Sequence, residues 1–481
     1  MGIGAALPRS APEAQGVRSG AIEAFLDEVR ERKSELHSFM LVRHGRVVAE
    51  GWWSPYRAAD RHMLFSLSKS FTSTAVGFAL SEGLLSLEDR VVGFFGEEDL
   101  PADVSPSLAE MRVRDLLMMG TGHAAEPTLH GATDGNWAKA FLSAPVEFAP
   151  GTKFVYNSGA TYMLSAILRR ATGQSLLEYL DSRLLAPLGI VGATWESCPR
   201  GIAVGGWGLS VTTEDIAKFG QLYLQRGVWN GRQLLPYGWA EEASRKHISN
   251  GDGGDSDWAQ GYGYQFWRCR HGAYRGDGAF GQFCVVLPEQ DAVLAITSGT
   301  NDMQAVLNAA WDTLLPAMAA EALPADAAAA DALASRLGAL RLDPPPASSS
   351  PSGERLLDGR TYALEPNWAE LASIGFEFPD GGQPTVVIGA RGGDGRLPIG
   401  RGAWSEGETR FHSNAPERVV GAYAWRDERT LEIAIRFVET PFAHTLACRV
   451  KGDDAEELEL ELTPNVSFGK REAAPIRGTR K

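Results

Sequence analysis

The stretch FSLSKSFTS, residues 65–73, places Ser66 three residues before Lys69 at the start of an apolar run. On a helix, residues three apart lie on one face, so the hydroxyl and the amine would stand side by side. A serine nucleophile needs a base at hydrogen-bond distance, and the unpaired N–H groups of a helix's first turn stabilise negative charge. The stretch therefore predicts a nucleophile, Ser66, with Lys69 beside it.

The spacing alone does not decide this, because the same two letters recur in SFGK, Ser467 to Lys470. Taken singly, Ser66 reads as a helix-capping hydroxyl and Lys69 as a solvated lysine. Ser467 fails the helix requirement, since Gly469 interrupts any helix and the segment lies among predicted strands. Further residues are needed to decide for Ser66.

The second element is KFVYNSGATYML, residues 153–164. Lysine is a poor base at its ordinary pKa of about 10.4, so a second titratable group is expected. Tyr156 lies in a predicted loop directly before a helix over 158–173, and a tyrosine beside an ammonium loses its proton more easily. Ser158 is interpreted as either the cap of that helix or a substrate contact.

The third element, YRGDGAFGQFCVVLPE (274–289), contains G-x-G-x-x-G. A dinucleotide-binding loop would need a helix after the glycines, but the residues that follow predict a strand. We instead expect a glycine-bracketed strand edge whose backbone approaches a substrate. The backbone N–H groups of Ser66 and Ala279 are the predicted pair of oxyanion donors.

Together and in this order, the three elements resemble the serine β-lactamase and penicillin-binding-protein superfamily. The resemblance covers roughly residues 15–320 and is greatest to class C-like β-lactamases, family VIII carboxylesterases and 6-aminohexanoate-dimer hydrolases. It implies that Ser66 is acylated, that Lys69 and Tyr156 shuttle its proton, and that water then releases the acyl group.

Two departures from that superfamily bear on the substrate. The Tyr-x-Asn motif reads Tyr-Asn-Ser here, with Ser158 in the place of the amide that would contact substrate. The Lys-Thr-Gly strand has no lysine, and Arg275 and Gly278 stand in the aligned region. Arg275 would either replace the lysine's charge or point into solvent. Trp207, in GGWGLS, either lines an acyl pocket or packs in the core.

The pattern of elements predicts a mixed α/β (α+β) fold. Strand patterns at 37–53, 262–270, 281–288 and 291–299 enclose helical sequence, so we expect one antiparallel sheet flanked by helices around an inserted helical region. The predicted domains are a β-lactamase-like domain over 1–325, an extended Ala/Pro/Ser-rich linker over 326–354, and a small all-β barrel or sandwich over 355–481.

Composition limits the classes of function. The 481 residues carry a net charge of −14, which opposes binding to nucleic acid or an anionic membrane. The first residues lack the apolar core of a secretory signal and the four cysteines show no C-x-x-C spacing, so we expect a cytoplasmic protein with buried thiols. No metal signature or cofactor loop is present in the sequence. The oligomeric state is left open.

The sequence therefore predicts a cofactor-independent serine hydrolase acting on a small-molecule ester, with a carboxylesterase as the leading hypothesis. Amide hydrolysis, on nylon-type oligomers, D-amino-acid peptides or β-lactams, is the alternative within enzymes. A non-catalytic binding protein on the same fold is the rival of another class, and the complete Ser-Lys-Tyr set argues against it.

Overall fold

The computed structural model describes residues 6–390, 393–410, 416–471 and 473–481. Contacts divide the chain into two units. The first unit consists of the N-terminal residues up to Gly51 together with 61–298 and 302–338, and 339–481 form most of the second. The short segments 52–60 and 299–301 also pack with the second unit, although they belong to the predicted first domain.

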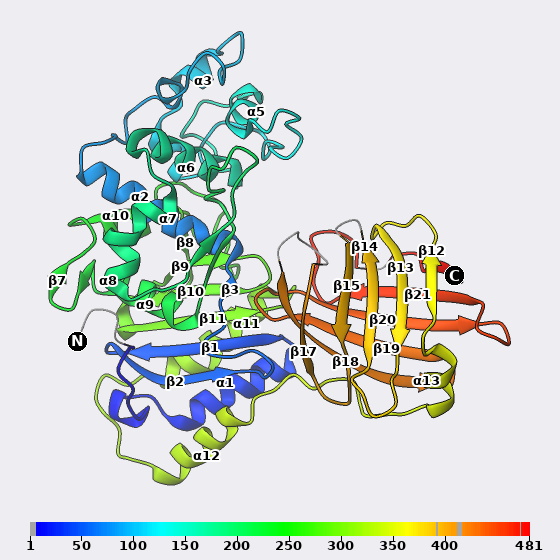
Figure 1. Ribbon diagram of the computed structural model, residues 1–481. Helices are drawn as coiled ribbons and strands as arrows, with labels where there is room; N and C mark the ends of the chain where they lie inside the picture. The colour runs from blue at the N-terminus through cyan, green and yellow to red at the C-terminus, as the bar shows by residue number, and fades with distance from the viewer. Residues whose placement is uncertain (1–5, 391–392, 411–415, 472) are drawn as a thin grey trace. The chain divides into compact units, whose positions relative to one another are not determined.

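The first unit is built on one antiparallel sheet with the strand order β2-β1-β11-β10-β9-β8 (Figure 1). Strands from the two ends of the unit pair directly, with Phe39 opposite Ile296. This confirms the expected sheet of sequence-distant pieces, although β8 is much shorter than the predicted strand over 262–270. The strands are β1 (Leu36–Arg43), β2 (Arg46–Trp52), β8 (Trp267–Arg268), β9 (Tyr274–Gly278), β10 (Gln282–Leu287) and β11 (Ala292–Ser298).

Helices cover this sheet, so its central strands are buried throughout. α1 (Ser19–Glu31) packs with α11 (Met303–Ala309) and lies along β1 and β2 (Figure 1), while α9 (Thr213–Leu224) packs on β1, β10 and β11. Thr212 caps α9 and forms a capping box with Asp215.

The inserted region between β2 and β8, which the structure describes in full, contains α9 and eight further α-helices of the unit. They are α2 (Ser68–Ser81), α3 (Pro106–Glu110), α4 (Val113–Leu117), α5 (Trp137–Ser143), α6 (Ser158–Thr172), α7 (Leu176–Leu180), α8 (Ala186–Leu188) and α10 (Trp239–Ser244). Two small sheets join β3 (His62–Met63), β5 (Leu209–Val211) and β4 (Thr194–Trp195), and β6 (Val228–Trp229) with β7 (Arg232–Gln233).

Helix α2 is buried along nearly its whole length although it is rich in hydroxyls. Those hydroxyls find partners on other segments: Ser70 Oγ donates to Gln265 O (2.8 Å), Thr72 Oγ1 to Gly205 O (2.9 Å), and Ser73 Oγ to Tyr264 O (2.7 Å). Because a buried hydroxyl without a partner is costly, these bonds hold α2 at one depth and one rotation.

The segment 326–354 differs from the extended linker that was expected. Residues Ala327–Gly338 form helix α12, and residues Pro351–Leu357 form α13. Alanine is the strongest helix former, so the Ala-rich part folds as soon as it has a surface to pack on. That surface is α1: Leu333 is buried, and Arg336 pairs with Asp27 at 2.7 Å.

The second unit is an all-β domain whose described strands close almost into a barrel, which confirms the predicted class. The strand order runs β15-β14-β13-β12-β22-β21-β20-β19-β18, with β16 and β17 both paired to β18, and β15 also contacts β17. The strands are β12 (Thr361–Leu364), β13 (Leu371–Glu377), β14 (Thr385–Ala390), β15 (Gly393–Pro398), β16 (Gly400–Arg401), β17 (Ser405–Thr409), β18 (Glu417–Asp427), β19 (Thr430–Phe437), β20 (Ala443–Lys451), β21 (Glu457–Pro464) and β22 (Ile476–Arg480).

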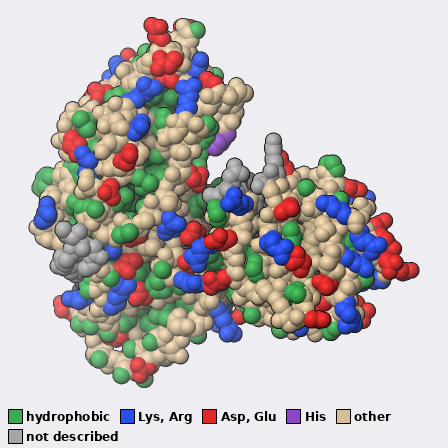
Figure 2. Space-filling view, in the orientation of Figure 1, with side chains coloured by type: hydrophobic (Ala, Val, Ile, Leu, Met, Phe, Trp, Pro, Cys, Tyr) green, Lys and Arg blue, Asp and Glu red, His purple; other side chains and the backbone are tan. Residues whose placement is uncertain are grey.

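Three further features concern the whole described chain. All four cysteines are free and buried, as expected. Acidic and basic side chains are interspersed over the face shown in Figure 2. None of the helices in the described part of the chain has the length and apolar character needed to cross a membrane.

Candidate active site

Ser66 and Lys69 lie side by side, as their spacing predicts. Lys69 Nζ is 2.9 Å from Ser66 Oγ. Ser66 is not the first residue of α2 but lies in a 3₁₀ turn, η2 (Phe65–Leu67), that leads into the helix at Ser68. The serine is partly exposed whereas the lysine is buried, so a substrate can reach the hydroxyl while the amine stays shielded from water.

The turn that carries Ser66 is fixed by the small sheet beside it. Leu64 N donates to Leu209 O (2.9 Å), and Leu209 N donates to Ser68 Oγ (3.1 Å). The hydroxyl of Ser68 thus accepts from a backbone N–H group of the small sheet. The sequence places Ser66 and Ser68 two residues apart, and only the geometry separates their tasks.

The environment of Lys69 suits a base. Its Nζ donates to Gly206 O (2.7 Å) and contacts Ser158 Oγ (3.2 Å). Burial lowers the pKa of Lys69 to about 7, against the weaker opposing effect of the carboxylates of Glu126 and Asp277. Near neutral pH, a large fraction of this amine is therefore unprotonated and able to accept a proton.

Tyr156 completes the group. It lies two residues before α6 and its side chain hydrogen-bonds to Ser66. Lys69 Nζ is 4.9 Å from the centre of the phenol ring. The pKa of Tyr156 is raised, by burial and by the carboxylate of Asp277. This is opposite to the expectation that the neighbouring ammonium would ease its ionisation, because burial disfavours the charged phenolate. Tyr156 is a protonated phenol at neutral pH.

The glycines of β9 allow a close approach between this strand and a neighbouring segment of the protein. A Cβ on Gly278 would lie 1.9 Å from Leu64 O, and a Cβ on Gly276 would lie 2.4 Å from Leu67 Cδ1. The close approach that requires glycine is therefore to the turn that carries Ser66. Gly278 thus packs against the turn that carries Ser66, and its contact with a substrate stays a prediction.

The backbone beside this contact is in an unusual conformation. Phe65 and Phe280 both have positive φ, +46° and +66°, and their rings meet edge to face at 5.6 Å. Residues of this kind rarely adopt positive φ, and such conformations cluster at functional sites. Phe65 precedes Ser66 and Phe280 follows Ala279. Among the described residues, no acceptor receives the N–H of Ala279, which leaves it available to an oxyanion.

Arg275 does not reach solvent, and its charge is already balanced. Its side chain is fully buried and pairs with Asp277, at 2.7 Å between Nη2 and Oδ2. The guanidinium lies over the ring of Trp258, 4.3 Å from its centre. Arg275, which was expected either to replace the charge of the superfamily's lysine or to point into solvent, therefore pairs with the buried carboxylate of Asp277.

The two other tentative residues border the group. Asn157, and not Ser158, caps α6: its Oδ1 accepts from Ala160 N at 3.1 Å. Ser158 is the first helical residue and turns its hydroxyl to Lys69. Trp207 is partly buried, directly after the Gly206 carbonyl that holds Lys69, and its ring packs against that of Trp137.

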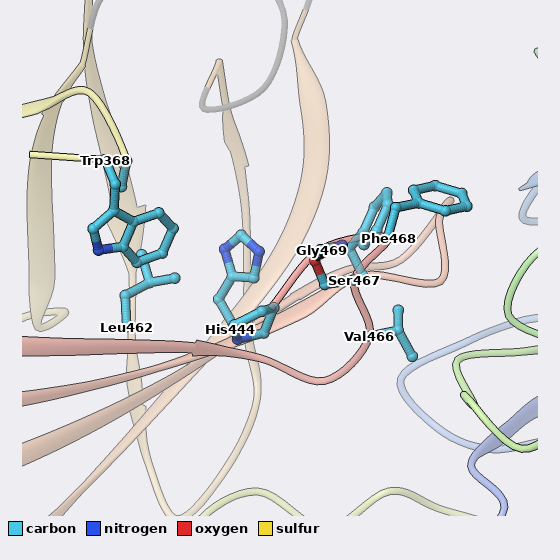
Figure 3. Close-up of a pocket in the computed structure, with 10 residues that line it drawn as sticks. Trp368, His444, Leu462, Val466, Ser467, Phe468 and Gly469 are labelled. Carbon is cyan, nitrogen blue, oxygen red and sulfur yellow. Dashed lines mark hydrogen bonds between the residues drawn. The ribbon is translucent and has the colours of Figure 1, made fainter. Parts of the chain in front are cut away.

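The second Ser-x-x-Lys segment lies in the C-terminal unit, in the loop after β21. Ser467 Oγ accepts from Gly469 N (3.0 Å), as in a local turn. Figure 3 shows this serine at a pocket in which apolar side chains such as Trp368 and Leu462 surround His444. The segment is not helical, so Lys470 is not brought onto the face of the serine.

Sequence reasoning missed several residues of the site. Trp267 stacks on Tyr156 (5.3 Å between ring centres) and its indole hydrogen-bonds to Asp277. Glu126 Oε1 accepts from Ser158 N at 2.6 Å. Neither residue lies in a motif. The carbonyl of Gly206, which accepts from Lys69, was also missed. The glycine pair before Trp207 was a signal for it, because glycines mark places where the backbone approaches another group closely.

Comparisons with known proteins agree with this geometry. The family model described as Beta-lactamase matches residues 23–317. A 6-aminohexanoate-dimer hydrolase of Paenarthrobacter ureafaciens is 28% identical over 312 residues, which cover 60% of this chain and 79% of that protein.

Two solved structures share the fold. SurE superposes with a TM-score of 0.51 at 18% identity, over 90% of this chain and 99% of that one. EstCE1, described as a hydrolase with promiscuous acyltransferase activity, gives 0.50 at 15% identity, over 60% and 98%.

The fold and the site together define a serine hydrolase built on an antiparallel sheet that helices cover. Within that class, the chain belongs to the β-lactamase family, together with the penicillin-binding proteins, as the three sequence elements indicate.

Proposed function

We propose that the protein is a carboxylesterase that forms an acyl-enzyme on Ser66. The observation that carries the proposal is the triangle of Ser66, Lys69 and Tyr156, in which a partly exposed hydroxyl meets a buried amine with a depressed pKa and a protonated phenol. Nothing in this group depends on a histidine or a carboxylate as the base.

In the first half-reaction, Ser66 Oγ attacks the carbonyl carbon of the ester while Lys69 Nζ accepts the hydroxyl proton. The N–H groups of Ser66 and Ala279 receive the negative charge on the carbonyl oxygen. The C–O bond to the alcohol then breaks, and the proton passes to the leaving alkoxide through the phenol of Tyr156. Water next attacks the acyl-enzyme with the same groups in reversed roles.

Esters are favoured over β-lactams and over peptides with a C-terminal carboxylate because the cation in the place of the superfamily's strand lysine is not available to a substrate carboxylate. Arg275, the residue in the corresponding position, is buried and paired with Asp277. Hydrolysis of linear amides is the second candidate, supported by the similarity to a protein named as a 6-aminohexanoate-dimer hydrolase.

Intact-protein mass spectrometry after rapid mixing with a p-nitrophenyl ester, a linear amide and a penicillin tests the proposal. We expect an acyl adduct on Ser66 and turnover of the ester. Ser66→Ala should abolish both, whereas Ser467→Ala, the matched control in the second Ser-x-x-Lys segment, should leave both unchanged. Ester turnover that persists in Ser66→Ala would reject the assignment, and a stable penicillin adduct without ester turnover would favour a penicillin-binding protein.

A further inference from the structure

An acidic side chain lies beside the catalytic group without a role in the chemistry proposed above. Glu126 belongs to the loop before α5, and its Oε1 accepts from the N–H of Ser158 at 2.6 Å. The hydroxyl of the same Ser158 is 3.2 Å from Lys69 Nζ. Glu126 is exposed, so its carboxylate is in contact with solvent at the site and not buried within it.

The charge of Glu126 is not balanced by the protein. Within the described ranges of the chain, no lysine, arginine or histidine lies within ion-pair distance of its carboxylate. The other carboxylate near Lys69, that of Asp277, is buried and paired with Arg275 at 2.7 Å. The charge of Asp277 is therefore matched within the protein, whereas Glu126 presents an exposed negative charge beside the site.

An aromatic surface lies on another side of Lys69. Gly206 O accepts from Lys69 Nζ at 2.7 Å, and the next residue, Trp207, is partly exposed. The ring of Trp207 lies 5.6 Å from that of His130, which is exposed. An indole face attracts cations through its quadrupole, most strongly when the cation bears alkyl groups and sheds its water readily.

Glu126 contacts Ser158 and Trp207 follows Gly206, and both Ser158 and Gly206 are partners of Lys69. The exposed carboxylate and the accessible indole would both attract a cation. Resting on the proposed function, we propose that Glu126 determines specificity by favouring esters with an ammonium group near the scissile bond, with Trp207 as the second contact for that group. By the same charge, Glu126 disfavours substrates that carry a carboxylate there.

Pairs of substrates that differ in one charge test this proposal. In the leaving-group pair, choline butanoate is compared with its carbon isostere, in which a carbon atom replaces the nitrogen. In the acyl pair, the p-nitrophenyl ester of trimethylammoniohexanoate is compared with its carbon isostere. The measured quantity is the ratio of kcat/KM for the charged ester to that for the neutral one. This ratio cancels any effect of a substitution on Lys69, because both esters share the same base.

In at least one pair, Glu126→Gln should lower the ratio about fivefold at low salt, with a smaller loss at high salt, as for a partly exposed charge pair. The neutral ester reports any change that the substitution makes through Lys69, whose pKa the Glu126 carboxylate raises, and that change cancels in the ratio. Glu31→Gln, which removes an exposed carboxylate at the end of α1, is the matched control and should leave the ratio unchanged.

The outcomes separate this inference from the function on which it rests. If the neutral esters are hydrolysed and Glu126→Gln leaves both ratios unchanged, Glu126 does not recognise the cation and the inference is wrong, while the esterase assignment stands. If the wild type hydrolyses none of the four esters, the proposed function fails and the inference fails with it.

Discussion

The depressed pKa of Lys69 predicts the pH dependence of acylation. Burial lowers this pKa from 10.5 to about 7. At pH 7, about half of the enzyme molecules then carry a neutral amine, compared with about one in 3,000 for a lysine of ordinary pKa. A base must be unprotonated to act, so kcat/KM for a neutral ester should fall about tenfold per pH unit below pH 7 and level off above it.

The assay is steady-state hydrolysis of a neutral p-nitrophenyl ester from pH 5 to pH 9, about two units on either side of that pKa. Absorbance is read at the isosbestic wavelength of nitrophenol, and the rate with Ser66→Ala is subtracted as background. Because the Glu126 carboxylate raises the pKa of Lys69, Glu126→Gln should move the acid limb to lower pH. A rate that still rises tenfold per pH unit up to pH 9, or a flat profile, would refute the view that burial makes Lys69 the base.

Two substitutions test the rest of the group. Tyr156→Phe should lower kcat by at least about 10²-fold, because the phenol delivers the proton to the leaving group. Tyr237→Phe, at a residue 95% exposed, is the control. Near-normal turnover by Tyr156→Phe would leave Tyr156 as a packing residue. Gly278→Ala should cost about 10²-fold in kcat and about 1–3 kcal/mol of stability, because its Cβ would lie 1.9 Å from Leu64 O and must displace the turn that carries the serine. Gly20→Ala in α1, where a Cβ meets nothing within 4 Å, should leave kcat unchanged and should not lower stability. A fully active Gly278→Ala would contradict the packing argument.

The parts of the fold and site that depend on local sequence could be predicted. The face shared by Ser66 and Lys69 follows from helical spacing, and the position of Tyr156 follows from the helix start after it. The prediction stayed ambiguous where neighbouring residues compete for one task. Asn157 and Ser158 are both good capping residues, and propensity does not tell which of them takes the cap.

Long-range packing could not be predicted in the same way. The burial of Arg275 depends on Trp258 and on Asp277 being brought around it by the folded sheet and its loops. Glu126 is separated from Ser158 by 32 residues, and nothing in its own surroundings in the sequence marks it. The pKa of Tyr156 was predicted in the wrong direction because the burial of the phenol and the nearness of Asp277 are properties of the tertiary structure.

The internal pairing of Arg275 has a consequence for efforts to redesign the enzyme. Exchanging it for lysine, to imitate its penicillin-recognising relatives, would place a shorter cation in the same enclosed space, still facing Asp277. Removing only one member of the pair would leave the other charge buried alone, at a cost of several kcal/mol (~3–5). Variant libraries aimed at new substrates should therefore keep these two positions fixed and vary the exposed residues of the loop at 124–130.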